Sequence, residues 1–180
     1  MEENNVPPVA ISLSGLSVEF CKILAAAPGG EPGALLAEVL RYLPRIYVAV
    51  NELKPYGDEN VDRETLNTDM ISASVSEDQY NDIRQGLAGV LGQYDVYLDT
   101  PVEDMRFSDT PVAVSLSEQL ADIFQSLADF AATLCCAVDF EIPDILAELK
   151  YRFETYLSET LCSALKAANF LYQSKAFQEE

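Results

Sequence analysis

The sequence predicts an all-α protein, a single-domain bundle of about five main helices. Apolar residues recur three and four positions apart in several long segments, the spacing that places them on one face of an α-helix. No segment shows the sustained apolar–polar alternation that would predict a β-rich fold. With 180 residues and 49% hydrophobic side chains, the chain is long enough to bury one core.

The folded domain is expected over residues 13–177, after a flexible N-terminal tail at residues 1–12. Pro7 and Pro8 should interrupt regular structure in that tail, because proline lacks an amide hydrogen. The first helix is predicted over residues 13–27, where apolar residues follow the helical period.

The turn Pro28-Gly29-Gly30 should end the first helix, and Pro32 suits the first position of a second. The helical period of the second helix continues to Leu53. Pro44 lies inside this run and should kink the helix, since its ring removes one main-chain hydrogen bond.

A third helix is predicted to begin with a capping box formed by Ser74 and Glu77, and to reach Leu91. Three glycines in its second half share one face and would allow a close helix crossing. These are Gly86, Gly89 and Gly92.

The central helix is predicted over residues 116–138, with Ser115 and Glu118 as its capping box. We expect Phe124 to face the core and Asp122 to face solvent. The other residues expected on the solvent face are Ser117, Gln119, Gln125 and Asp129.

A last helix is predicted over residues 141–175, opened by Pro143, and its length favours a bend. Two acidic connections break the helical pattern, at residues 54–73 and 94–114. A connection of the length of the first is either functional or mobile.

The formal charge of −19 limits the classes of partner. Nucleic acids and anionic membranes are bound through clusters of lysine and arginine, so neither is expected as a partner. No apolar run approaches the ~20 residues of a membrane span. The acidic start of the chain is unlike a secretory signal, and a cytoplasmic location is expected.

The chain contains no histidine, which removes His-ligated zinc and Ser-His or Cys-His nucleophile systems. Its four cysteines form no Cys-x-x-Cys pair and are expected to be free, buried thiols, so no metal or other cofactor is predicted. They are Cys21, Cys135, Cys136 and Cys162. The segment Ser163–Lys166 has the spacing of the S-x-x-K motif of penicillin-binding enzymes, but the supporting motifs are missing.

The connection at residues 94–114 carries the best candidate interaction surface, where carboxylates alternate with aromatic side chains. Such a surface could bind a basic protein partner or a hard cation, or simply be a solvated loop. Its candidate residues are Asp95, Tyr97, Asp99, Asp104 and Asp109.

Several segments, in order along most of the chain, resemble a bacterial all-helical family catalogued as a domain of unknown function. The strongest are SLSEQLADIFQSLADF at 115–130 and FETYLSETLCSALKA at 153–167; LPRIY at 43–47 and DVYL at 95–98 add to them. The family often has a Trp-Gly pair where Leu157-Ser158 stands here. The resemblance implies an all-α fold and adds no mechanism.

The first functional hypothesis is therefore a soluble, acidic protein-interaction domain without catalytic activity. The alternative is a binder of a small ligand, or an enzyme dependent on a divalent cation, that uses carboxylates in a pocket of the bundle. For the alternative we expect a deep cavity near Pro44, lined by Glu38, Tyr42 or Tyr47.

Overall fold

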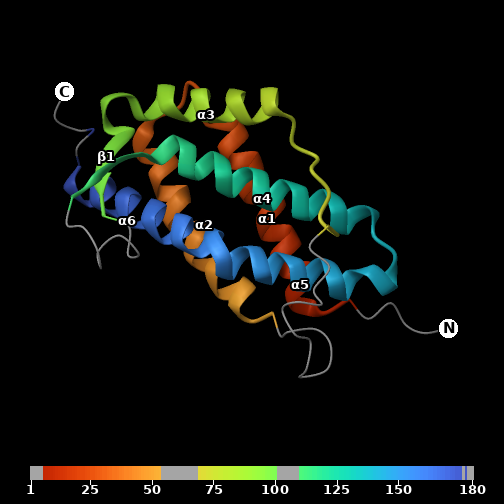
Figure 1. Cartoon of the computed structure of the whole chain (residues 1–180). Helices are drawn as coiled ribbons and strands as arrows, with labels where there is room; N and C mark the ends of the chain where they lie inside the picture. The colour runs from red at the N-terminus through yellow and green to blue at the C-terminus, as the bar shows by residue number, and fades with distance from the viewer. Residues whose placement is uncertain (1–5, 54–68, 101–109, 176, 178–180) are drawn as a thin grey trace.

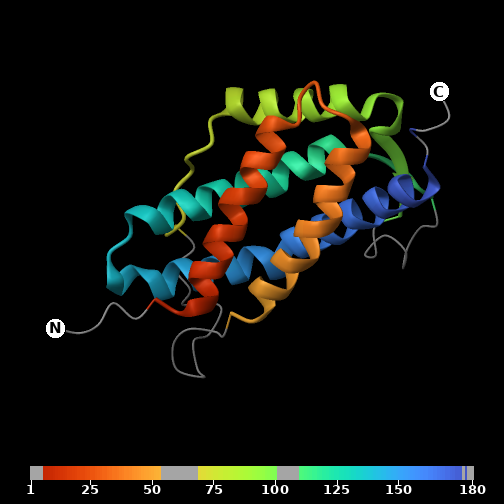
Figure 2. The ribbon, with the colours of Figure 1, turned by 180° about the vertical axis from the view of Figure 1, so that it is seen from behind.

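The computed structural model describes residues 6–53, 69–100, 110–175 and 177. Two long helical rods, α4 and the continuous α5–α6, run along the molecule, and α1 and α2 cross them on one side (Figures 1 and 2). α3 lies along the edge of α4. The helices are α1 (Pro8–Ala26), α2 (Pro32–Asn51), α3 (Glu77–Leu91), α4 (Leu116–Cys136), α5 (Ile142–Arg152) and α6 (Ser158–Ser174).

The all-α fold class is confirmed, with one small addition. Two four-residue strands, β1 (Val96–Asp99) and β2 (Val112–Ser115), pair antiparallel in a small ribbon. The sequence does contain their signal, because Val96-Tyr97-Leu98 and Val112-Ala113-Val114 are rich in β-forming residues. The runs are too short to compete with the helical pattern around them.

The first helix begins at Pro8, five residues before the predicted start at Leu13. Pro8 occupies the first turn, where the missing amide hydrogen has no partner to lose. Ala10 is fully buried, so residues 8–12 belong to the helix and not to a tail. Residues 1–5 of the predicted tail lie outside the described residues.

The second helix continues through Pro44 to Asn51. The third is capped two residues later than predicted, by Ser76 and Gln79, whose side chains bond each other's main-chain amides.

The predicted glycine face is not a helix crossing. A Cβ at Gly86 would lie 2.6 Å from the ring of Pro28, in the turn between α1 and α2, so Gly86 makes room for that turn. Gly89 faces open space. Gly92, with φ +57°, ends α3.

The predicted core face of α4 is largely correct, and Ser115 accepts the amide of Glu118 as predicted. The predicted solvent face is largely wrong. Ser117, Gln119 and Asp129 are buried because α3, the ribbon and the segment before α3 cover this side. Asp122 is half-buried and accepts a 2.7 Å hydrogen bond from Tyr80.

The predicted last helix is interrupted by a π-helical turn over Phe153–Leu157. This turn inserts a residue into the helical ladder, which re-aims the side chains that follow it. The core includes three fully or almost fully buried phenylalanines, Phe20, Phe130 and Phe153, with leucines from every long helix around them.

The four cysteines are free thiols, as predicted, but they are not all buried. Cys21 is half-buried and donates to the main-chain oxygen of Phe124, and burial raises the pKa of its thiol to about 12. Cys135, Cys136 and Cys162 are exposed, because they lie on the outer sides of α4 and α6.

Candidate functional site

Strand β1 presents its side chains in the reverse of the usual order. In a surface hairpin the apolar side chains face the core and the polar ones face water. Here Tyr97 and Asp99 turn toward α4 and α6, while Val96 and Leu98 are 61% and 70% exposed. On β2, Val112 and Val114 pair with Asp99 and Tyr97 and therefore share their inward face, although Val112, at the end of the ribbon, is 44% exposed.

Asp95, which precedes β1, is a structural residue. Its carboxylate is 9% exposed and accepts the main-chain amide of Ser117 at 2.7 Å. The hydroxyls of Ser115 and Ser117 also donate to it, each at 2.9 Å. A carboxylate at this position satisfies an amide of the first turn of α4 and complements the helix dipole. Asp95 therefore fixes the ribbon to α4 and offers no surface to a partner.

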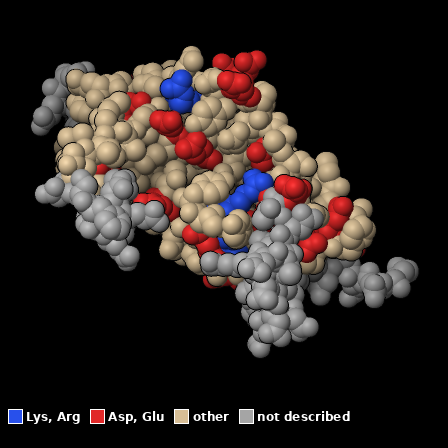
Figure 3. Space-filling model, viewed as in Figure 1, with Lys and Arg blue, Asp and Glu red and all other residues tan. Residues whose placement is uncertain are grey.

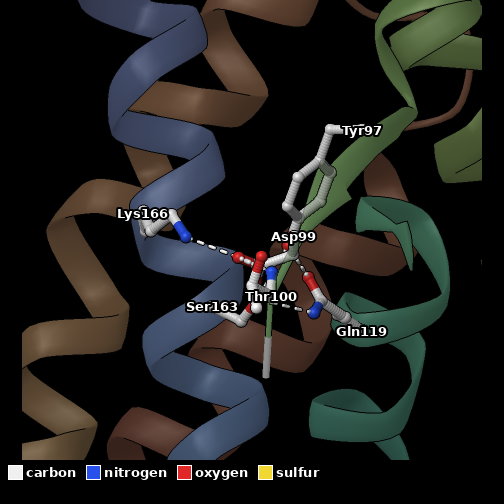
Figure 4. A network of polar contacts seen from close by, with 6 residues as sticks. All are labelled: Tyr97, Asp99, Thr100, Gln119, Ser163 and Lys166. Carbon is white, nitrogen blue, oxygen red and sulfur yellow. Dashed lines mark hydrogen bonds and ion pairs between the residues drawn. The ribbon is translucent and has the colours of Figure 1, made fainter. Parts of the chain in front are cut away.

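Tyr97 and Asp99 meet side chains from α4 and α6 in one polar network (Figure 4). The Tyr97 hydroxyl donates to Gln119 Oε1 at 2.8 Å, and it lies 2.8 Å from the Ser163 hydroxyl. Gln119 Nε2 donates to Ser163 Oγ at 3.0 Å. Three elements that are distant in sequence are thus joined through hydroxyl and amide groups.

The second half of the network is charged. Ser163 donates to Asp99 Oδ2 at 2.5 Å, and the Lys166 ammonium contacts Oδ1 at 2.5 Å. The main-chain amide of Thr100 also donates to Oδ1, at 2.9 Å. All three donors hold the carboxylate in one orientation against α6.

These contacts decide the ionisation of the network. Burial works to raise the pKa of Asp99, but the bonds from Lys166, Ser163 and Thr100 outweigh it and leave the pKa below its ordinary value. The bond to Asp99 raises the pKa of Lys166. Burial raises the pKa of Tyr97. Near neutral pH the network therefore consists of a carboxylate, an ammonium and a neutral phenol.

This arrangement positions groups well but does not activate a nucleophile. Ser163 donates a hydrogen bond to Asp99, whose lowered pKa makes it a weak base. In an S-x-x-K active site we would expect the lysine to contact the serine, whereas Lys166 bonds the carboxylate. The network instead holds the ribbon on the bundle, and we call it the clasp. Its members are Tyr97, Asp99, Gln119, Ser163 and Lys166.

A pocket of about 440 Å³ opens beside the network, between β1, β2, α4 and α6. Asp99, Ser163 and Lys166 form one side of it. Thr155 and Tyr156 reach it from the π-helical turn, and π turns are frequent at functional sites. The pocket is lined with hydroxyl groups and both signs of charge.

The cavity expected near Pro44 has a different lining from the one predicted. A pocket beside Pro44 is lined by Leu40, Pro44, Cys162, Leu165, Lys166, Asn169 and Gln173. Tyr42 instead packs into the core, stacked on Phe20, and donates to Glu19. Glu38 pairs with Arg41, 3.7 Å away. These two side chains are engaged by neighbouring helical residues, so they are not aimed into that pocket.

The predicted surface at residues 94–114 thus divides into three parts. Asp95 is a buried cap, and Tyr97 and Asp99 belong to the clasp. Asp104 and Asp109 lie outside the described residues. Gln119 and Ser163 were not predicted as site residues, and only the spacing of Ser163 and Lys166 hinted at them. Within the described ranges, no group of three or more His, Cys, Asp or Glu side chains could hold a metal ion.

Comparison with known proteins shows the family to which the chain belongs. Residues 4–174, nearly the whole sequence, match the family described as Domain of unknown function (DUF5063). The chain belongs to this family. The resemblance to an all-helical domain of unknown function, expected from the sequence, is therefore confirmed.

One solved structure has the same fold as this member of the DUF5063 family. It is the crystal structure of protein BF1032 from Bacteroides fragilis, a structural genomics target. Its identity to this chain is 21%, the match covers 94% of this chain and 99% of that one, and the TM-score is 0.73. At this identity the likeness shows the fold alone. No curated protein matches the chain.

Proposed function

We propose that this chain is a cytoplasmic protein-interaction domain without catalytic activity, and that the ribbon of β1 and β2 docks an extended segment of a basic protein. The observation that carries the proposal is the reversed side-chain order of β1. Val96 and Leu98 are exposed although Tyr97 and Asp99 of the same strand are held inward. Contiguous exposed apolar side chains on a rigid support are typical of a contact surface.

The ribbon is suited to accept another strand. Within the described part of the chain the sheet has two strands, so each strand keeps one edge that no further strand pairs with. An extended segment can bond such an edge through its main chain while its side chains contact the exposed face. Asp95 and Asp99 hold both ends of β1, so little conformational freedom would be lost on binding.

The charge of the chain favours a basic partner. Acidic side chains are spread over the face shown in Figure 3, with few basic ones among them. A net charge of −19 attracts a basic segment from a distance and raises its rate of association, while the apolar ribbon supplies the contact.

A defined peptide tests this proposal. A synthetic peptide that alternates lysine with valine is titrated into ¹⁵N-labelled protein, and amide shifts are followed by NMR. We expect the shifts to gather at residues 96–99 and 112–115, and to weaken as salt rises. A matched peptide that alternates glutamate with valine should bind far less.

Shifts centred away from the ribbon would contradict the proposal, as would equal binding of both peptides. The double variant Val96→Ser with Leu98→Ser should lose the shifts. Its control is Val48→Ser with Phe170→Ser, which removes side chains of comparable exposure (55% and 70%) from α2 and α6.

The pocket beside the clasp favours a second candidate function, the binding of a small polar ligand. The supporting observation is the π-helical turn that brings Thr155 and Tyr156 to Asp99 and Lys166. Thermal-shift screening with polar metabolites tests it. A shift that is lost in Thr160→Val, a pocket-lining variant of nearly the same size, would support this function. No shift with any compound would count against it.

A further inference from the structure

The pocket beside the clasp has two ends that differ in charge. Asp99 and Lys166 contact each other at one end (Figure 4). Glu159 lies toward the other end, because residues 159, 163 and 166 share one face of α6 and seven helical residues span about 10 Å. Glu159 is exposed, and within the described part of the chain it has neither a hydrogen bond nor an ion pair. The pocket therefore carries one negative charge that the protein itself does not balance.

The hydroxyl groups on either side of Glu159 offer lone pairs to the pocket. Thr155 and Thr160 each donate to the main-chain oxygen four residues earlier, at 2.9 and 3.2 Å. A hydroxyl has one hydrogen to donate, so both groups can only accept a further hydrogen bond. Ser163 donates to Asp99 and is in the same position. A ligand in this part of the pocket must supply the donors.

Tyr156 adds an aromatic ring next to Glu159. Its hydroxyl lies 3.2 Å from that of Ser126 on α4 and is engaged there. The side chain is 45% exposed and lines the pocket. The face of an aromatic ring carries partial negative charge and attracts ammonium groups. The ring, the unbalanced carboxylate and the hydroxyl lone pairs thus favour the same kind of ligand, a positively charged hydrogen-bond donor.

We infer that this pocket binds a small organic ammonium ion, a protonated aliphatic amine, with the charged group held by Glu159 and Tyr156. The inference rests on the second candidate function above, the binding of a small polar ligand, and names the class of that ligand. The pocket volume of about 440 Å³ suits a molecule of this size. An aliphatic amine is protonated at neutral pH, since its pKa is close to that of a lysine side chain.

The charges of the pocket disfavour an anionic ligand. Lys166 is the only basic residue among the described residues that line it, and Asp99 already neutralises its charge. A phosphate or carboxylate would meet this paired lysine and the repulsion of Glu159. An ammonium group beside Glu159 is about two helical turns from Lys166, so it avoids the repulsion of that lysine.

Isothermal titration calorimetry on the full chain tests the inference with three probes that share a five-carbon chain and differ in charge. The probes are cadaverine, which is a diamine, pentanediol, which is neutral, and glutarate, which is a dianion. We expect cadaverine alone to bind, and its affinity to fall as the NaCl concentration rises.

Glu159→Gln should weaken cadaverine binding by roughly tenfold or more, because it removes the unbalanced charge at nearly constant size. Glu77→Gln is the matched control, since it removes the same charge from an exposed position at the start of α3, and it should leave the affinity unchanged. Tyr156→Leu should also weaken binding, because leucine keeps an apolar side chain but has no aromatic face.

A lysine side chain of a segment docked on the ribbon would present the same ammonium group as a free amine. The lysine–valine peptide distinguishes the two sources. Glu159→Gln should weaken the peptide as well as cadaverine if the docked segment supplies the ammonium group, and cadaverine alone if a free amine does.

Binding of pentanediol or glutarate without cadaverine would overturn the inference and leave the second candidate function standing. Equal loss of cadaverine binding in Glu159→Gln and Glu77→Gln would also overturn it, because the amine would then be attracted by the acidic surface in general. Binding of none of the probes would overturn it too, whereas the candidate function fails only if the wider metabolite screen is also negative.

Discussion

Buried carboxylates hold the main chain at several points of this molecule. Asp95 accepts the amide of Ser117, and Asp129 accepts those of Ser74 and Val75 at 2.6 and 2.9 Å. Glu148, fully buried, accepts the amide of Ile71 at 2.7 Å and lies 2.5 Å from Arg152. Part of the negative charge therefore has a structural role, and Asp95 and Asp99 are examples, because their carboxylates bond groups of the bundle.

The hydrogen bonds that Asp99 accepts should make a pH-dependent contribution to the stability of the protein. Asp99→Asn should lower the free energy of unfolding by about 1–2 kcal/mol near neutral pH, because charged hydrogen bonds are lost. The pKa of Asp99 is lowered in the folded state, so its contribution is complete above the ordinary aspartate value and disappears as pH falls through the lower folded value. In urea unfolding, the free energies of unfolding of wild type and variant should converge as the pH falls below about 4.

The control for this prediction is Asp82→Asn on the exposed side of α3, which should change stability by no more than about 0.5 kcal/mol at any pH. A constant gap between wild type and Asp99→Asn down to acid pH would show that the charge of Asp99 does not stabilise the clasp.

At the scale of the element, replacing two glycines of α3 by alanine should change the stability of the protein in opposite directions. Gly89→Ala adds a methyl group in open space and should stabilise the protein by about 0.5–1 kcal/mol. Gly86→Ala places its Cβ 2.6 Å from the Pro28 ring, so the turn must shift and stability should fall by about 1–3 kcal/mol. Thermal melts of the two variants compare them directly, and a shift of the same sign would contradict this packing.

The faces of α4 give a second comparison. Phe130→Ala should cost about 3–5 kcal/mol, since Phe130 is fully buried. Phe124 is only partly buried, at the edge of a groove between α1 and α4, and Phe124→Ala should cost roughly half as much. Chemical unfolding measures both, and equal losses would mean that the groove is closed in solution.

The helices could be predicted from the sequence because their periodicity is local information. Leu120, Ile123 and Leu127 lie where the spacing places them. The solvent face of α4 could not be predicted, because the burial of Gln119 and Asp129 depends on which distant segments cover them. The π-helical turn at Phe153–Leu157 has no local signal of this kind. The clasp likewise joins residues 97, 119 and 163, which only the tertiary fold brings together.

At the scale of the whole molecule, the ribbon of β1 and β2 is an exposed apolar surface on a strongly acidic bundle. We propose that it binds a basic segment, with the net charge of −19 raising the rate of association and the exposed side chains of β1 supplying the contact.

The most direct measurement is capture of partners from a bacterial lysate at low and at high salt, read by mass spectrometry, with three immobilised proteins. These are wild type, the ribbon variant Val96→Ser with Leu98→Ser, and the control Val48→Ser with Phe170→Ser. We expect a stoichiometric basic protein on wild type and control at low salt, absent at high salt and absent from the ribbon variant. Equal capture by all three proteins, or capture that does not respond to salt, would contradict the proposed role of the ribbon.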